Sequence, residues 1–423
     1  MKPVHLTIPA RVGIAMALAA MTATAGAPAL AESNAQLQAR VAALEARVNS
    51  VEHEGRIKIP AGTTLQFGGY IKTDFIFDFD QALGALFNAG SITVPSVNLR
   101  NQHFQAQARQ SRFFFKTETQ TAQGPLKTHV EFDFFGGGGN EVFSNSYSPR
   151  LRHAYGSWNG WTVGQTWSTF MPIESYPTTV DFEGPSGIPF VRQALVRYTF
   201  PASDNLNISV ALENSEFSGR NLATGAKIGE TSGSGISANI DQLPDFVLAA
   251  AWSNEKSFVK FATVLRQFST PSGFPGNDTA TGWGVNLSGH TSLWQGGMIN
   301  ASFSYGDGIG RYIIDGANRD GYIDPATGKI TTISAGGATI GLSQEISSNL
   351  TGGLAFGYYR LDDVLPASVG DPLDSLTTVH ASLFYNPREN ITIGGEIIYG
   401  KKDLVGGGSA DATRLQTSVQ FNF

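Results

Sequence analysis

Alternation of apolar and polar side chains constrains this chain more than any other feature of its sequence. Residues 412–423 divide between two faces of an extended segment, with Leu415, Thr417, Val419, Phe421 and Phe423 on one and Arg414, Gln416, Ser418, Gln420 and Asn422 on the other. Successive side chains of a β-strand point to opposite faces. An apolar face that ends in an aromatic residue, opposite a face with uncharged amides, is typical of a strand that separates lipid from water. The alternative is an edge strand of a soluble sandwich.

The same two-residue period begins at Gly62 and continues to the end of the chain. After the first segment, further segments lie near 106–118, 125–135, 148–158, 161–169, 193–201, 205–213, 244–253, 257–267, 281–290, 296–305, 330–344, 349–360, 375–386, 390–401 and 412–423. They make about sixteen in all, and bacterial outer-membrane barrels have an even number of strands.

The connections between these segments alternate between short and long. Residues 121–124 and 158–161 are tight turns, whereas 81–105, 168–191 and 213–243 are long. Short periplasmic turns opposite long extracellular loops are typical of outer-membrane barrels, and a soluble sandwich does not sort its loops in this way. The sequence therefore predicts an all-β fold, an antiparallel transmembrane β-barrel of about 16 strands over residues 62–423. A barrel of this size has room for an aqueous channel.

Composition agrees with this prediction. Hydrophobic residues make up 41% of the chain and no apolar run of membrane-helix length occurs, which argues against a bundle of membrane helices. Cysteine is absent, so the chain has no disulfide framework and no thiol chemistry, as is compatible with export. A net charge of −6 argues against nucleic acid as a partner.

The first 54 residues differ from the rest. Residues 1–31 have the charged start, short apolar run and small-residue cleavage site of a secretory signal peptide. In residues 32–54 a heptad seam spaced 4, 3, 4, 3 is formed by Leu37, Val41, Leu44, Val48 and Val51. We expect a short N-terminal coiled coil in the periplasm, supported by an oligomeric body. The alternative is an amphipathic helix packed on its own domain.

Strand parity also predicts which charged residues face the barrel interior. The basic residues assigned to the lumen are Lys72, Arg112, Lys116, Lys127, Arg150, Arg152 and Arg197, joined by Lys260. The same parity points Leu151 and Tyr155 outward and leaves Arg109 unassigned. Basic side chains on neighbouring strands of a narrow pore raise the local anion concentration, and arginine binds carboxylates through its planar fork. The alternative is a structural network in which Glu118, Glu131 and Asp133 pair with these arginines.

The segment 168–191 is rich in proline, glycine and aromatic residues, which predicts an ordered loop. Folded into the barrel, it would narrow the pore and place Glu174, Asp181 and Glu183 opposite the basic wall. The alternative is a loop outside the barrel that caps it or contacts another subunit. No enzyme motif is present, and residues 318–324 match a calcium loop poorly. We therefore expect no enzymatic activity, no cofactor and no metal site.

Several short stretches occur in an order that resembles the DcaP-like trimeric porins: GGYIKTD at 68–74, QSRF at 110–113, GQTWS at 164–168, DFEGP at 181–185, and the arginines at 192 and 197 around VRY at 196–198. The resemblance covers most of the mature chain. It implies a homotrimeric, sixteen-stranded channel in the outer membrane of a Gram-negative bacterium, with a periplasmic coiled coil.

It also implies a constriction that passes small anionic or polar solutes, carboxylates and dicarboxylates among them. The matching positions are Arg112, Arg150, Arg152 and Arg197, with the loop from Ser168 as constrictor. The acids of that loop argue against strong anion selectivity, so a non-selective diffusion porin is the alternative function. Besides solutes, the expected partners are outer-membrane lipid and further copies of the chain.

Overall fold

The computed structural model describes residues 40, 42, 62–94, 101–139, 141–229, 241–270, 273–363, 365–366, 369–370 and 372–423. The chain divides into two compact units, Met1–Pro60 and Ala61–Phe423, and all the strands below belong to the second. The expected signal peptide and the heptad seam residues Leu37, Val41, Leu44, Val48 and Val51 lie outside the described residues. Among the residues that are described, no helix is long and apolar enough to cross a membrane.

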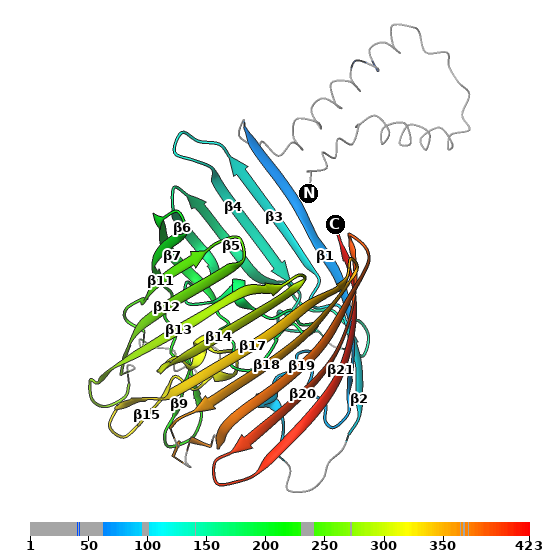
Figure 1. Ribbon diagram of the computed structural model, residues 1–423. Coiled ribbons are helices and arrows are strands. Elements are labelled where there is room, and N and C mark those ends of the chain that lie inside the picture. Colours follow the sequence, from blue (N-terminus) through cyan, green and yellow to red (C-terminus); the bar gives the residue numbers. More distant parts are fainter. Residues whose placement is uncertain are drawn as a thin grey trace. The chain divides into compact units, whose positions relative to one another are not determined.

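One antiparallel sheet closes on itself to form a barrel (Figure 1). Its strands are β1 (Thr63–Asp78), β2 (His103–Gln107), β3 (Arg112–Thr119), β4 (Leu126–Asp133), β5 (Arg150–Trp158), β6 (Trp161–Trp167), β7 (Arg192–Ser203), β8 (Leu206–Glu213), β11 (Asp245–Ser253), β12 (Ser257–Ser269), β13 (Thr279–Trp294), β14 (Gly297–Asp307), β17 (Ser334–Ser347), β18 (Leu350–Leu361), β19 (Leu373–Arg388), β20 (Ile391–Leu404) and β21 (Ser409–Asn422). β2 and β3 both pair with β1, each strand from β3 onward pairs with the next, and β21 pairs with β1 from Tyr70↔Asn422 to Asp78↔Arg414.

β2 and β3 are two parts of one barrel strand. Both pair with the same side of β1, β2 along Asp74–Asp78 and β3 along Thr63–Tyr70, and residues 108–111 interrupt them. The described barrel therefore has sixteen strand positions, which confirms the sixteen-stranded antiparallel barrel predicted from the sequence. The last strand closes the barrel, as its alternation indicated.

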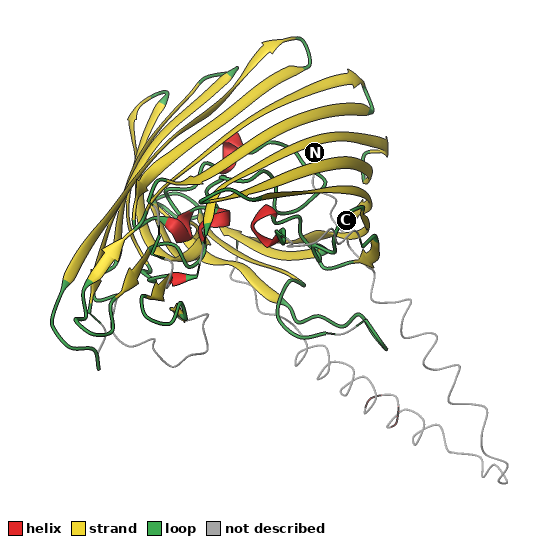
Figure 2. Cartoon of the chain, turned by 90° about the horizontal axis from the view of Figure 1, so that it is seen from below, coloured by secondary structure: helices red, strands yellow, loops and turns green. Residues whose placement is uncertain are grey.

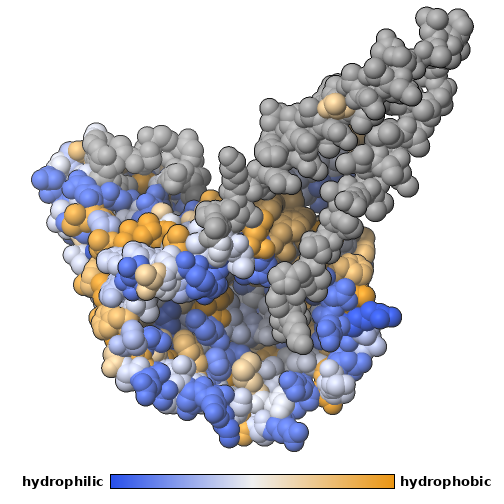
Figure 3. Space-filling view, turned by 90° about the horizontal axis from the view of Figure 1, so that it is seen from above, coloured by the Kyte–Doolittle hydropathy of each residue, from blue (hydrophilic) through white to orange (hydrophobic). Residues whose placement is uncertain are grey.

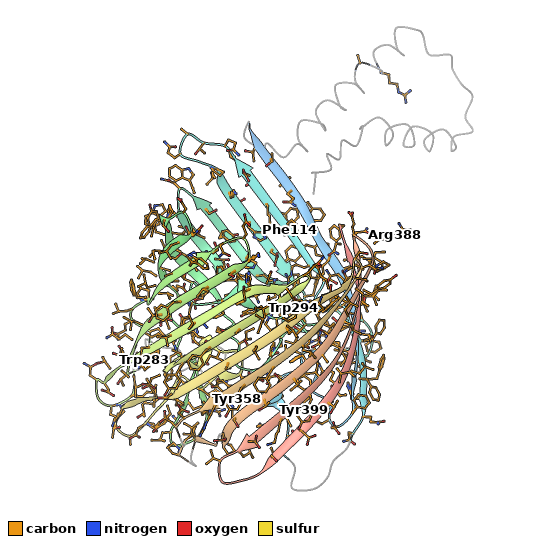
Figure 4. All side chains as sticks on the ribbon, in the orientation of Figure 1. Phe114, Trp283, Trp294, Tyr358, Arg388 and Tyr399 are labelled. Carbon is orange, nitrogen blue, oxygen red and sulfur yellow. The ribbon has the colours of Figure 1, made fainter. Side chains whose placement is uncertain are left out.

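The outer surface of the barrel is apolar. The closing strand exposes Phe421 and the terminal Phe423, at 50% and 54% of their full surface. Aromatic residues also occupy both ends of β13, where Figure 4 shows Trp294 toward the short turns and Trp283 toward the long loops. Exposed aliphatic residues with aromatic residues at both edges form the lipid-facing band of an outer-membrane barrel.

The long loops do not simply extend from the barrel. Figure 2 shows loops and short helices inside the ring of strands. Among the described residues, 3₁₀ helices are η1 (Ala89–Ser91), η2 (Ile173–Ser175), η4 (Gly310–Tyr312) and η5 (Ile314–Gly316). A small second sheet contains β9 (Gly219–Asn221), β10 (Lys227–Ile228), β15 (Gly321–Ile323) and β16 (Ile330–Thr332). Figure 3 shows the opposite end, with the short turns, where hydrophilic residues border a hollow.

Glycines on the inner wall leave room for the loop 168–191. A Cβ added to Gly357 in β18 would lie 2.4 Å from the Ser186 carbonyl oxygen, and one added to Gly394 in β20 would lie 2.8 Å from the Val180 side chain. The loop backbone therefore approaches the strand backbone closely at Gly357, and the Val180 side chain does so at Gly394. The loop lies inside the barrel, as the sequence predicted, against the wall formed by β17 to β20.

Candidate pore constriction

Hydrogen bonds attach the tip of the loop 168–191 to one wall of the lumen. The Lys72 ammonium on β1 donates to the Val180 carbonyl oxygen at 2.7 Å. The Glu396 carboxylate on β20 accepts from the backbone N–H groups of Val180 and Asp181, the latter at 3.1 Å. Further along, the Ser186 N–H donates to the Thr378 hydroxyl at 2.9 Å. The loop is thus held from three strands.

Two of the three loop acids do not face the opposite wall, which corrects the expectation from the sequence. Asp181 is buried and accepts hydrogen bonds from the N–H groups of Phe87, Glu183 and Gly184. Glu183 is buried beside the 79–94 part of the connection after β1, where its carboxyl accepts from the Asn88 amide at 2.5 Å. Burial, followed by the nearby Asp181, raises the pKa of this loop carboxyl to about 8.

The wall that faces the loop carries most of the predicted arginines, and a β-bulge determines their arrangement. Glu131 pairs with His153 and Phe132 pairs with Leu151, so Arg152 is an extra residue in β5. Arg150, Arg152 and His153 consequently all point into the lumen. The bulge also turns Tyr155 inward, where its hydroxyl lies 3.4 Å from His129 Nδ1, so the outward orientation predicted for this residue is wrong.

Three of these arginines share two carboxylates. Arg150 forms two hydrogen bonds to Asp133, at 2.9 and 2.7 Å. Arg152 donates to Glu131 at 2.7 Å and to Asp133 at 3.0 Å. Arg112 Nε lies 3.4 Å from Glu131. Two acids of the network that the sequence left open as an alternative, Glu131 and Asp133, therefore pair with arginines, whereas Glu118 lies beside Lys127. The three arginines still outnumber the two acids.

Aromatic side chains from the loop cover the arginine cluster. The Phe182 ring lies 5.7 Å from the Arg150 guanidinium and 5.3 Å from that of Arg152. Arg192, the first residue of β7, lies 4.7 Å from the Trp167 ring and 5.5 Å from the Phe190 ring. Its Nη1 is buried and has no hydrogen-bond partner. Cation–π contacts orient a guanidinium without neutralising its charge.

Arg192 was not among the predicted lumen residues. It shares the parity of Val196, which is exposed to lipid, so strict alternation points it outward. It lies next to the last residue of the loop and pairs with Trp167 at the end of β6, where alternation no longer determines direction. The sequence signal that marks it is its position where the loop 168–191 ends and the strand begins.

The predicted lysines lie apart from this cluster. Lys72 is buried under the loop, between Val180, Gln110 and Asp74, and is not on the open pore wall. Lys116 lies over the Phe114 ring at 4.5 Å. Lys127 lies near the turn 120–125, 3.6 Å from Glu118, with 52% of its side chain exposed.

Arg109 lies in the interruption between β2 and β3, which explains why parity could not place it. Its guanidinium lies 3.4 Å over the ring of Tyr147, in the connection between β4 and β5. The two residues border a hollow that also contains Ile71 and Phe113. Those last two alternate with lumen residues, so Arg109 belongs to the outer side of the barrel.

The closed sixteen-stranded barrel, its apolar exterior and its inward-folded loops define the class of porin-type outer-membrane channels. The sequence matches the family of DcaP outer membrane proteins over residues 32–423, and the chain belongs to that family. It is therefore an outer-membrane β-barrel of a Gram-negative bacterium and a channel, not an enzyme. A search of curated protein sequences found no match.

Solved structures share the fold. The outer membrane channel DcaP of Acinetobacter baumannii has 22% identity and a TM-score of 0.72, over 87% of this chain and 99% of that one. An anion-selective porin from Comamonas acidovorans has 11% identity and a TM-score of 0.52, over 85% and 100%. The trimer form of OmpT from Vibrio cholerae has 11% identity and a TM-score of 0.53, over 86% and 100%.

Proposed function

We propose that this channel passes small anionic and polar solutes, including carboxylates and dicarboxylates, by passive diffusion through a basic constriction. The observation that carries the proposal is the charge balance on the wall that faces the loop. Arg112, Arg150, Arg152 and Arg192 gather there around two carboxylates, Glu131 and Asp133. The excess of positive charge in a narrow lumen favours anions.

The loop supports the same conclusion. Asp181 and Glu183 are buried on the far side of the loop, so they subtract little from the positive field in the pore. The loop presents Phe182 and Phe190 to the arginines. Apolar rings on one side and guanidinium groups on the other suit a solute that carries carboxylates on a small carbon frame.

A non-selective diffusion porin remains the second candidate, and one observation favours it. Three of the four clustered arginines already hold carboxylates at hydrogen-bond or ion-pair distance. If these pairs cancel in the field of the pore, only Arg192 acts on a permeating ion. Such a channel would show weak charge preference and would select by size alone.

The reversal potential in a potassium chloride gradient separates the two candidates. The full-length protein in a planar bilayer is expected to prefer chloride, and to pass succinate when it replaces chloride. Equal permeability of both ions would favour the non-selective porin. A preference for potassium would contradict the proposed function.

We also propose that the protein is a homotrimer with a cleaved signal peptide at 1–31 and a periplasmic coiled coil at 32–54. The comparison with the trimer form of OmpT supports the oligomeric state. Native mass spectrometry in detergent tests it, and a monomer would contradict it. Sequencing the mature amino terminus tests cleavage, which is expected to leave Glu32 as the first residue.

A further inference from the structure

A second basic region lies between the loop 168–191 and the short-turn end of the barrel. A cavity of about 670 Å³ is bordered there by lumen residues of β7, β8 and β12 and by the turns around Gly124 and Asn159. Arg197 from β7 and Lys260 from β12 both line it. The turn residues place the mouth of this cavity at the end of the barrel that Figure 3 shows.

Arg197 and Lys260 keep most of their hydrogen-bond donors available. The Arg197 guanidinium has one long contact, 3.5 Å to the Thr169 hydroxyl. The Lys260 ammonium donates to the Met171 carbonyl oxygen at 2.7 Å. Within the described part of the chain, neither cation has a carboxylate within 4.0 Å. A guanidinium has five donors and an ammonium three, so both can still bind a ligand.

The loop holds both cations in place. Thr169 and Met171 belong to the first residues of the loop, and the Thr169 N–H donates to Glu213 at 2.7 Å. Glu213 also accepts from the Gln193 amide at 2.6 Å, so both of its oxygens are occupied. Neutral oxygens of the loop therefore position the two cations, and the nearby Glu213 carboxylate already accepts hydrogen bonds from other groups.

This region is separate from the arginine cluster. Arg197 is five residues from Arg192 along β7, which corresponds to about 17 Å of extended strand. Arg112, Arg150 and Arg152 are attached to Glu131 and Asp133, and none of these residues borders the cavity. An anion that leaves the cluster toward the short turns therefore meets a second pair of cations.

We propose that Arg197 and Lys260 form a second anion subsite, on the short-turn side of the loop, that binds a small organic dianion such as a dicarboxylate. The hydroxyl groups of Thr199 and Ser209 and the amide of Asn207 border the same cavity and can form hydrogen bonds to the ligand. Glu174, the exposed acid of the loop, also borders it and weakens the attraction. Binding that is weak enough to release the solute is what conduction requires.

Transient block of single channels by succinate tests this subsite. The full-length protein in a planar bilayer is studied in potassium chloride, with succinate added on one side at a time. Replacing both cations (Arg197→Gln with Lys260→Met) is expected to weaken succinate block from the short-turn side roughly tenfold. Glu174→Gln is expected to strengthen it. The matched control is Lys256→Met, in an exposed turn at the same end of the barrel.

Unchanged succinate block in the double variant would overturn the subsite, as would a Glu174→Gln channel that binds succinate no better. The subsite rests on the proposed function, but different experimental results contradict the two proposals. A cation preference of the unmodified channel contradicts the proposed function. A retained chloride preference with unchanged succinate block contradicts the subsite alone. Heat-modifiable mobility on gels confirms that each variant is folded.

Discussion

Arg152 Nε donates to Glu131 Oε1 at 2.7 Å, and both side chains are almost completely withdrawn from solvent. Arg152 is the extra residue of the bulge in β5, which leaves Arg150 and Arg152 both on the lumen side and brings His153 into the lumen beside them. A guanidinium held in this way contributes to the field of the pore but has few donors left for a permeating solute. Structural and permeation roles are thus divided among arginines that look equivalent in the sequence.

Arg152→Ala is expected to destabilise the barrel more than it changes ion selectivity. The substitution leaves Glu131 and Asp133 buried with fewer partners, and breaking a buried ion pair in this way costs about 3–5 kcal/mol. The midpoint of urea unfolding in lipid vesicles measures the effect. A variant with an unchanged midpoint would mean that Arg112 and Arg150 can satisfy both acids.

Arg192→Ala, unlike Arg152→Ala, is expected to lower the anion preference of the channel with little loss of stability. Its charge has no carboxylate within 4.0 Å among the described residues, and the aromatic rings beside it can pack against each other when it is removed. We expect the chloride-to-potassium permeability ratio to fall by about twofold or more. The reversal potential measures this ratio, and Lys256→Ala, in the exposed turn between β11 and β12, is the control.

Most of the barrel could be predicted from the sequence because one physical rule governs each strand. Side chains that alternate between lipid and water leave a period of two, and the closing strand shows it from Arg414 to Phe423. Loop lengths then distinguish a membrane barrel from a sandwich. The interruption at 108–111 was not visible, because the residues on either side keep the composition of a strand.

The details of the constriction could not be predicted from the sequence, because they depend on contacts between distant segments. One extra residue in β5 reverses the parity after Arg152, and no local signal marks a bulge there. The direction of Asp181 is set by N–H groups of its own loop and of Phe87, 94 positions away in the chain. The availability of Arg192 depends on which arginines Glu131 and Asp133 bind.

The raised pKa of the Glu183 carboxyl predicts that the stability of the protein depends on pH. Its usual pKa is 4.5 and burial raises it to about 8, so the folded protein binds more protons than the unfolded chain between these values. The free energy of unfolding therefore falls as pH rises from about 4.5 to 8, and the loss is complete above that range. Unfolding midpoints at pH 6, 7 and 9 measure this dependence.

Glu183→Gln keeps an uncharged acceptor beside Asn88 and is expected to remove this part of the pH dependence. Glu389→Gln, in the exposed turn between β19 and β20, serves as the control and is expected to behave as the unmodified protein does. If Glu183→Gln retains the full fall in stability between pH 6 and 9, the carboxyl is already ionised in the folded protein.

The glycines under the loop predict a change in conductance that involves no charge. A Cβ at Gly357 would lie 2.4 Å from the Ser186 carbonyl oxygen and 2.6 Å from the Pro185 Cβ, so Gly357→Val must move the loop away from β18. Because the loop lies between β18 and the arginine wall, the displacement narrows the pore. We expect lower single-channel conductance and a cost of about 1–3 kcal/mol in stability.

Gly395→Val is the matched control, since a Cβ there meets nothing within 4 Å. Equal conductance in the two variants would mean that the loop does not set the width of the pore.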